Sequence, residues 1–257
     1  MSSARVLVVL AALAALVLTA CGTSSGQQAP PARTLTVSAA ASLTDVYTGL
    51  EPQFEQANPG TEVRFNFGGS DTLAQQVVQG APADVLATAS TRTMQTAQQA
   101  GRIDGEPLSF ATNKLQIAVP LGNPKGITGL ASLVGPQVTE AVCAPAVPCG
   151  AATEAAERAA GVTLDPVSEE PDVRSVLQRV STRNVDAGLV YLTDVRATAG
   201  QLEGIDFPQA AAPGAAQNYL VGVVAGSPNS DLARRWIAYV TGPEGDATMA
   251  EAGFEVR

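Results

Sequence analysis

Two serines stand in short, uncharged turns between an apolar run and a helical pattern. Ser42 follows three alanines in AAASLTD, and Ser70 follows two glycines in FGGSDTL. The start of a helix presents N–H groups without intrahelical partners and about half a positive charge. Several helix starts aimed at one point hold a dianion without any cationic side chain. We therefore expect Ser42 and Ser70 to donate hydrogen bonds to an anion through hydroxyl and backbone N–H groups.

Helix capping is the competing interpretation of these serines. Ser42-x-x-Asp45 resembles a capping box, with Asp in place of the usual Glu, in which the serine would serve only its own helix. Two more helix starts have the same small, uncharged character or a proline at the first turn. They are residues 147–151 (VPCGA), which contain Cys149, and residues 171–174 (PDVR), which contain Val173.

Three further side chains are candidates for a ligand site. Tyr191 ends a predicted strand in GLVY, and its phenol either points into a crevice as a donor or packs at the rim of the sheet. Arg174 and Lys125 are the cationic candidates, and we interpret each as a surface residue or an ion-pair partner.

Residue types that are missing exclude several classes of function. The 257-residue chain contains no histidine, which removes a serine–histidine triad and histidine metal ligands. Its net charge is −9 and it has no Lys/Arg-rich run, so nucleic-acid binding is not expected. An enzyme would need Ser42 or Ser70 as nucleophile and Lys114 or Lys125 as base, and this Ser–Lys hydrolase is a remote alternative. We expect a binding protein with no cofactor and no catalytic residues.

The N-terminal residues are a targeting segment rather than part of the fold. Arg5 precedes an apolar run, residues 6–17, that is too short for a comfortable membrane span. The following LTAC resembles a lipobox, which predicts a signal peptide at residues 1–20 and a lipid anchor, including palmitate, on Cys21. An ordinary signal peptide with an accidental cysteine is the alternative. Residues 21–33 are rich in Gly, Ser, Gln and Pro, so we expect a flexible tether on the extracytoplasmic face of the cell membrane.

Two cysteines remain after Cys21. Cys143 and Cys149 lie close together in CAPAVPC, and an exported protein resides where disulfides persist. We expect a disulfide between them, with two free thiols or a metal pair as alternatives. A metal pair is disfavoured because two thiolates without histidine do not complete a tetrahedral site.

Strand-like and helical patterns alternate along the rest of the chain. Apolar runs and alternation predict strands at residues 35–40, 63–67, 85–89, 114–120, 138–142, 187–191 and 217–224. Helical spacing predicts helices at residues 42–57, 73–78, 91–100, 151–160, 173–183, 231–240 and 243–252. This alternation indicates an α/β fold with parallel sheets covered by helices, and ligands of such sheets bind at the carboxyl ends of strands.

Several motifs, taken in order, resemble one known family. They are AAASLTD, FGGSDTLAQQ, GAPADV, DVRSVLQRV, AGLVYLTDV and WIAYVTGPEGDATMAEAGFEV. In these motifs, and from Leu35 onwards, the chain is similar to the periplasmic molybdate-binding proteins of ABC transporters. The resemblance implies a type II periplasmic binding fold with a ligand cleft between two α/β lobes. We expect lobe I at residues 34–112 with about 226–257, and lobe II at about 113–225.

The resemblance also implies a ligand site made of uncharged donors. It assigns hydroxyl and N–H donors to Ser42 and Ser70, backbone N–H donors to Cys149 and Val173, and a hydroxyl donor to Tyr191. Family members often have alanine where this chain has Cys149, a departure of little consequence if only the N–H is used. No side chain would bind molybdenum directly, because the metal arrives as an oxyanion.

The resemblance implies a monomer that captures molybdate, and tungstate with it, between closing lobes. The loaded protein would deliver its ligand to a membrane permease with a cytoplasmic ATPase. An all-donor site favours fully deprotonated dianions, whereas hydrogen phosphate needs an acceptor, which only Asp45 or Asp71 could supply. Sulfate, or another small solute on the same fold, is the alternative ligand because the sequence does not fix the size of the cavity.

Overall fold

The structure, a computed structural model, describes residues 33–257. The signal peptide expected at residues 1–20, Cys21 and the tether as far as residue 32 lie outside the described residues. Arg33, expected as the last residue of the tether, is instead the first residue of a strand. Within residues 33–257, no helix is both long enough and apolar enough to cross a membrane.

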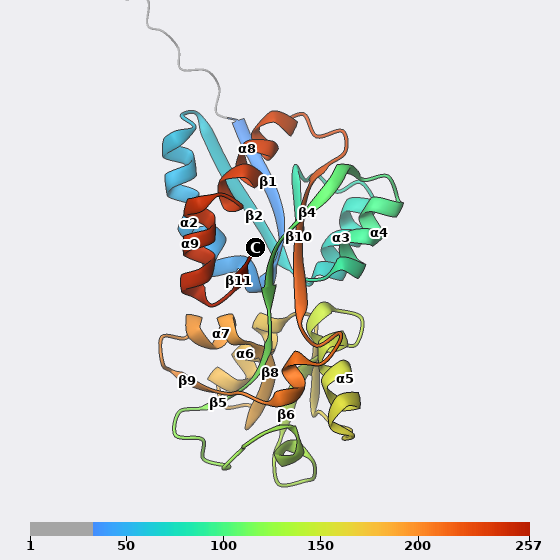
Figure 1. Cartoon of the computed structure of the whole chain (residues 1–257), viewed down its shortest axis with the longest axis vertical. Helices are drawn as coiled ribbons and strands as arrows, with labels where there is room; N and C mark the ends of the chain where they lie inside the picture. The colour runs from blue at the N-terminus through green and yellow to red at the C-terminus, as the bar shows by residue number, and fades with distance from the viewer. Residues whose placement is uncertain (1–32) are drawn as a thin grey trace, which may run out of the picture. The chain divides into compact units, whose positions relative to one another are not determined.

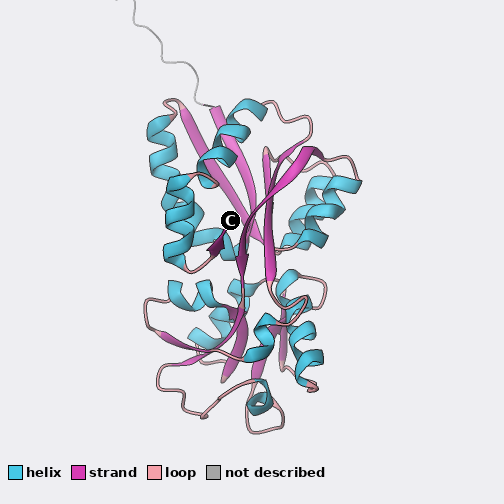
Figure 2. Ribbon diagram, in the orientation of Figure 1, coloured by secondary structure: helices cyan, strands magenta, loops and turns pink. Residues whose placement is uncertain are grey.

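Two sheets divide the described residues into two lobes (Figures 1 and 2). The sheet of lobe I has the strand order β11-β4-β10-β3-β1-β2. Its strands are β1 (Arg33–Ala40), β2 (Thr61–Gly68), β3 (Val85–Thr88), β4 (Ile103–Asn113), β10 (Gln217–Val224) and β11 (Glu255–Val256). The sheet of lobe II has the order β7-β6-β8-β5-β9. Its strands are β5 (Leu115–Pro120), β6 (Glu140–Cys143), β7 (Ser168–Glu170), β8 (Ala187–Tyr191) and β9 (Leu202–Ile205).

Helices cover both faces of the lobe I sheet (Figure 1). On one face lie α2 (Thr44–Ala57), α8 (Ser230–Val240) and α9 (Pro243–Ala252), and on the other lie α3 (Ser70–Val78) and α4 (Thr91–Gln99). Strand β3 shows why both faces are covered: Val85 and Ala87 pack in the core with α2 and α8, whereas Leu86 packs with α3 and α4. Successive side chains of a strand point to opposite faces, so a continuous apolar run needs a core on each side.

Lobe II has a core of its own around its smaller sheet. Its helices are α5 (Pro148–Ala160), α6 (Val173–Ser181) and α7 (Leu192–Ala197), with short 3-10 turns η2 (Leu130–Leu133) and η3 (Pro208–Ala211). Ile117 of β5, Leu189 of β8 and Val176 of α6 are fully buried in this core. Helix α6 therefore lies against the centre of the sheet, which fixes where its first residue points.

The expectation of parallel sheets was wrong, because both sheets are mixed. In lobe I, β1 pairs parallel with β2 and β3, but β10 pairs antiparallel with β3 and β4. In lobe II, β5 pairs antiparallel with β8 and β9. In lobe I the physical reason is the connection between the lobes: β4 carries the chain toward lobe II and β10 brings it back beside β4 (Figure 1). An outgoing and a returning strand that lie side by side run in opposite directions.

The edges of the expected lobes shift for the same reason. Strand β10 lies within the range expected for lobe II, about 113–225, but it pairs with β3 and β4 and so continues the lobe I sheet. We take residues 33–113 with 217–257 as lobe I and residues 114–216 as lobe II. Strand β4, whose sequence IDGEPLSFATN combines glycine, proline and exposed polar residues, had no counterpart among the expected strands.

Candidate functional site

One small cavity between the two lobes brings all five expected ligand residues together. Lobe I contributes residues at or just after the ends of β1, β2 and β3, namely Ala40, Ala41, Ser42, Gly68, Gly69, Ser70 and Ala89. Lobe II contributes Val147, Pro148, Cys149, Asp172, Val173 and Tyr191. The cavity is small: the centre of a water-sized sphere can reach a volume of ≈ 20 Å³ inside it. A cavity that holds one water has about 10–15 Å³ by the same measure. In this closed arrangement the cavity suits a small compact ion and excludes an organic solute.

Three of the turns that surround the cavity begin without a side-chain cap. Helix α3 begins at Ser70 after Gly69, and α5 begins at Pro148 after Val147, and neither preceding residue caps the helix through its side chain. The short 3-10 turn η1 (Ala41–Leu43), which leads into α2, likewise has no side-chain cap. The first N–H groups of these turns therefore have no side-chain acceptor of their own, and their partial positive charge points at the cavity.

The capping interpretation of the two serines does not hold. Ser42 lies inside η1 and the residue that precedes α2 is Leu43, while Ser70 is the first residue of α3 rather than its cap. Both side chains instead bond to partners distant in sequence. The hydroxyl of Ser70 accepts the N–H of Ala89 at 3.0 Å, which leaves its own proton free for a ligand.

Ser42 has a partner that the sequence did not reveal. Its Oγ lies 2.6 Å from the hydroxyl of Tyr219 in β10. With Tyr219 as the donor, the Ser42 proton is free to point into the cavity. Burial raises the pKa of Tyr219, which keeps this phenol protonated and able to donate. No local pattern in QNYLVGVV marks Tyr219, because only the pairing of β10 with β3 and β4 brings it beside Ser42.

Tyr191 places a buried hydroxyl at the cavity. Its side chain is 1% exposed, and its Oη makes no hydrogen bond to any of residues 33–257. Burial, and then Tyr219 and Asp194 nearby, raise the pKa of Tyr191 well above its ordinary value, so the hydroxyl remains a donor. A buried polar group without a partner costs about 1–3 kcal/mol. Such a cost at the wall of a cavity indicates a group that serves a ligand.

A disulfide fixes the turn that carries Cys149. Cys143 at the end of β6 is bonded to Cys149 in the first turn of α5, with a Cα–Cα distance of 5.6 Å. The neighbouring Gly150 packs so closely that an added Cβ would lie 2.0 Å from the carbonyl oxygen of Ala144. The disulfide and this close approach together hold the backbone N–H groups of the turn in place.

Charged side chains near the cavity are occupied elsewhere. Asp172, the charged residue of the cavity wall, caps α6 and accepts hydrogen bonds from the N–H and hydroxyl of Ser175 at 2.9 and 3.1 Å. Arg174 forms an ion pair with Asp45, and Lys125 lies 3.5 Å from Asp186. Both cationic candidates are therefore ion-pair partners, and neither lines the cavity.

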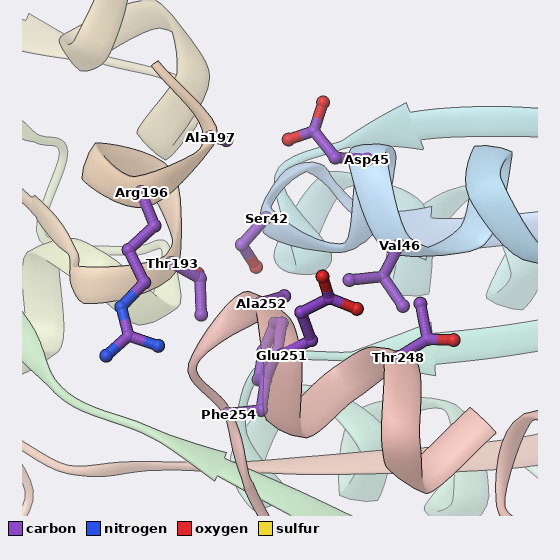
Figure 3. A pocket seen from close by; sticks show the side chains of 10 residues that line it. All are labelled: Ser42, Asp45, Val46, Thr193, Arg196, Ala197, Thr248, Glu251, Ala252 and Phe254. Carbon is purple, nitrogen blue, oxygen red and sulfur yellow. The ribbon is translucent and has the colours of Figure 1, made fainter. Parts of the chain in front are cut away.

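A second, wider cavity shares Ser42 with the first, and Figure 3 shows the side chains that line it. It has a volume of ≈ 270 Å³, and Ser42 lines both cavities. Its charged side chains come from both lobes, with Asp45 and Glu251 from lobe I and Arg196 from lobe II. The wider cavity was not expected from the sequence, because α7, which carries Arg196, was not among the predicted helices.

Comparison with known proteins places the chain in a family. The family model described as bacterial extracellular solute-binding protein matches residues 35–255. The molybdate-binding protein ModA of Mycobacterium tuberculosis H37Rv is 42% identical over 242 residues, which cover 92% of each chain. Among solved structures, the periplasmic molybdate-binding protein of Azotobacter vinelandii matches with a TM-score of 0.75 and 19% identity, over 87% of this chain and 99% of that one. The sulfate-binding protein SubI of M. tuberculosis matches with a TM-score of 0.71 and 19% identity over 86% of each.

The structural likenesses confirm the two-lobed fold of periplasmic binding proteins, and the sequence relatives are solute-binding proteins rather than enzymes. The match to the family model spans both lobes and every residue that lines the small cavity. The chain belongs to the bacterial extracellular solute-binding proteins and, by identity across nearly its whole length, to the family of ModA.

Proposed function

We propose that this protein captures molybdate in the small cavity and presents the closed, loaded form to the permease of an ABC importer driven by a cytoplasmic ATPase. The observation that carries the proposal is the Tyr191 hydroxyl, which is buried at the cavity wall and has no hydrogen-bond partner in the described part of the chain. A bound oxyanion would remove that deficit by accepting a hydrogen bond from the hydroxyl. The 42% identical relative named for molybdate binding supports the choice of anion.

The donors available at the cavity match a tetrahedral dianion. Three hydroxyls, those of Ser42, Ser70 and Tyr191, lie at its wall, together with the first backbone N–H groups of α5 and α6, at Cys149 and Val173. Helix starts stabilise an anion through backbone N–H groups, so no cationic side chain is needed. A cationic side chain would attract any anion. Closure of the two lobes removes the anion from water and gives its oxygens fixed donors from both sides.

The cavity wall offers few acceptors, so we expect it to bind phosphate more weakly than a fully deprotonated dianion. Hydrogen phosphate carries a proton that needs an acceptor, and an unmatched buried donor costs about 1–3 kcal/mol. Neither Asp45 nor Asp71 lines the cavity, and both Asp172 oxygens already accept hydrogen bonds from Ser175. Tungstate has the same charge and shape as molybdate, so we expect it to bind as well.

Calorimetric titration of the purified protein with molybdate, tungstate, sulfate and phosphate tests the proposal. We expect tight binding of molybdate and tungstate, and little response to sulfate and phosphate. Ser42→Ala combined with Ser70→Ala should weaken molybdate binding at least a hundredfold, because two donors are lost from one ligand. Ser181→Ala, at an exposed serine at the end of α6, is the matched control and should bind as the wild type does. No response to any oxyanion would overturn the proposal.

We also propose that the mature protein is a monomer anchored to the extracytoplasmic face of the membrane by lipid on Cys21. The support is the LTAC motif after a short apolar run, followed by a polar tether. Metabolic labelling with palmitate should mark the membrane-bound protein, and Cys21→Ser should release it from the membrane fraction. An unlabelled protein that stays with the membrane would contradict the anchor, and a dimer in light scattering would contradict the monomer.

A further inference from the structure

One arginine joins the two lobes next to the small cavity. Arg174, the second residue of α6 in lobe II, forms an ion pair through Nη2 with Oδ2 of Asp45, which lies on α2 in lobe I. Its Nε lies 3.3 Å from Oδ1 of Asp194, a carboxylate of lobe II that is fully buried. The Nε–H does not point at that oxygen, so the second contact is electrostatic rather than a hydrogen bond.

Each member of this network is adjacent to a proposed anion donor. Arg174 follows Val173, whose N–H begins α6. The other oxygen of Asp194 accepts the backbone N–H of Tyr191 at 3.0 Å. Asp45 lies in the first turn of α2, directly after the 3-10 turn that holds Ser42. The network therefore connects the donors of lobe II with the donor turn of lobe I without touching the anion itself.

The two contacts of Arg174 differ in kind: one lies within lobe II, and the other joins the two lobes. Asp194 is a buried carboxylate on the same lobe, and a buried charge without a counter-charge is strongly destabilising. This contact keeps the guanidinium in place whether the lobes are open or closed. Asp45 is 57% exposed and lies on the other lobe, so its pairing with Arg174 exists only while the lobes are closed.

We propose that Arg174 is a positioning residue that slows release of the bound anion: held by Asp194 on lobe II, it engages Asp45 of lobe I on closure. The inference rests on the proposed anion binding. A second contact between the lobes, from Nη2 of Arg92 on α4 to the carbonyl oxygen of Ala146 at 2.6 Å, lies on the α5 side of the cavity. Loss of Asp45 therefore weakens the closed form without abolishing it.

The test measures release of radiolabelled molybdate from the loaded protein into excess unlabelled molybdate. Asp45→Asn removes a half-exposed ion pair, so the release rate should rise about threefold at low salt, while the association rate stays the same. Arg174→Gln removes the same ion pair and also leaves Asp194, which accepts the Tyr191 N–H, without its counter-charge. The Tyr191 donor is then held less firmly, and release should rise about tenfold or more. Added salt should speed release from the wild type toward that of Asp45→Asn and change the variant little, because screening acts on the ion pair.

Arg179→Gln is the matched control. Arg179 lies on the same helix and pairs with Glu170 of its own lobe at 2.7 Å, so its loss should leave the release rate unchanged. If Asp45→Asn folds, binds molybdate and releases it at the wild-type rate, the role of Arg174 is refuted while anion binding stands. Equal acceleration by Arg179→Gln would refute it too, because the effect would then be a general weakening of α6. A wild type that binds no oxyanion overturns the proposed function instead.

Discussion

Replacing Gly69 with alanine should hinder full closure of the lobes without damaging either lobe. A Cβ at this position would lie 2.5 Å from the carbonyl oxygen of Pro171 and 3.4 Å from Val147, both across the cavity in lobe II. It would also lie 2.9 Å from a side-chain oxygen of Asp71, which can move by rotation. The Gly69 backbone itself, at φ −62° and ψ 129°, is open to alanine.

The size of the effect follows from the contact with Pro171. Non-bonded heavy atoms rest at about 3.5 Å, so the lobes must stay apart by about 1 Å at Gly69. Overpacking of this kind costs about 1–3 kcal/mol, which corresponds to a molybdate affinity roughly 5- to 150-fold weaker. The open form carries no such clash, and alanine restricts the unfolded chain, so the ligand-free protein should unfold at the same temperature or slightly higher.

Three measurements check this prediction. Calorimetry gives the affinity, thermal unfolding without ligand gives the stability, and small-angle scattering of the molybdate-saturated protein shows whether the lobes close. Gly49→Ala is the matched control, because Gly49 is an exposed residue of α2 with nothing within 4 Å of an added Cβ. It should bind molybdate as the wild type does. A Gly69→Ala protein that binds and closes like the wild type would show that the lobes do not meet in solution as they do in the structure.

Three other predictions follow from the site. Tyr191→Phe should weaken molybdate binding about tenfold or more but leave the ligand-free protein as stable or slightly more so, because it removes a buried hydroxyl that has no partner; a less stable protein with unchanged affinity would contradict this. Replacing Cys143 and Cys149 together by serine removes a cross-link over a separation of 6 residues, and should lower the free energy of unfolding in urea by about 2 kcal/mol. Molybdate binding should suffer less than in Tyr191→Phe, because the N–H of residue 149 remains; unchanged stability would mean that packing alone fixes the turn. Burial raises the pKa of Asp194 from 3.8 to about 6, against the lowering effects of Arg174 and the Tyr191 N–H. Folding raises the pKa of this carboxyl, so its contribution to stability is fully present when the pH is below the pKa of the unfolded chain, and it is lost as the pH rises through the pKa of the folded protein. The free energy of unfolding should therefore fall by up to about 3 kcal/mol as the pH rises from about 4 to about 7. Asp194→Asn should flatten that slope in urea unfolding, and an unchanged slope would assign it to other groups.

Local patterns were sufficient for most helices and for the short buried strands. The runs that became β3 and β8 are largely apolar on both faces, and helix α8 shows clear helical spacing, so their positions depend little on the rest of the fold. Strand β4 was missed because its alternation is broken by glycine and proline and much of it is exposed. It is a strand because β10 and β11 pair with it, which is a tertiary cause.

The partners of the site residues could not be predicted from local patterns either, because they are brought together only by tertiary contacts. Ser42 and Tyr219 are 177 positions apart and meet only because β1 and β10 both pair with β3. The ion pair of Arg174 with Asp45 needs the two lobes to face each other. A capping box was a reasonable interpretation of Ser42-x-x-Asp45, yet a 3-10 turn displaces Ser42 from the cap position and turns Asp45 toward the other lobe.

The sequence by itself determined which turns carry small residues, hydroxyls and helix starts, because those properties belong to a few consecutive residues. It also determined that no histidine, and no cluster of cations, takes part. Only the tertiary structure decided that five separate segments and the end of β8 meet at one cavity of ≈ 20 Å³, and that Tyr191 arrives there without a partner among residues 33–257. The meeting depends on the packing of two lobes and on the strands that join them, and that packing is a sum over contacts distant in sequence.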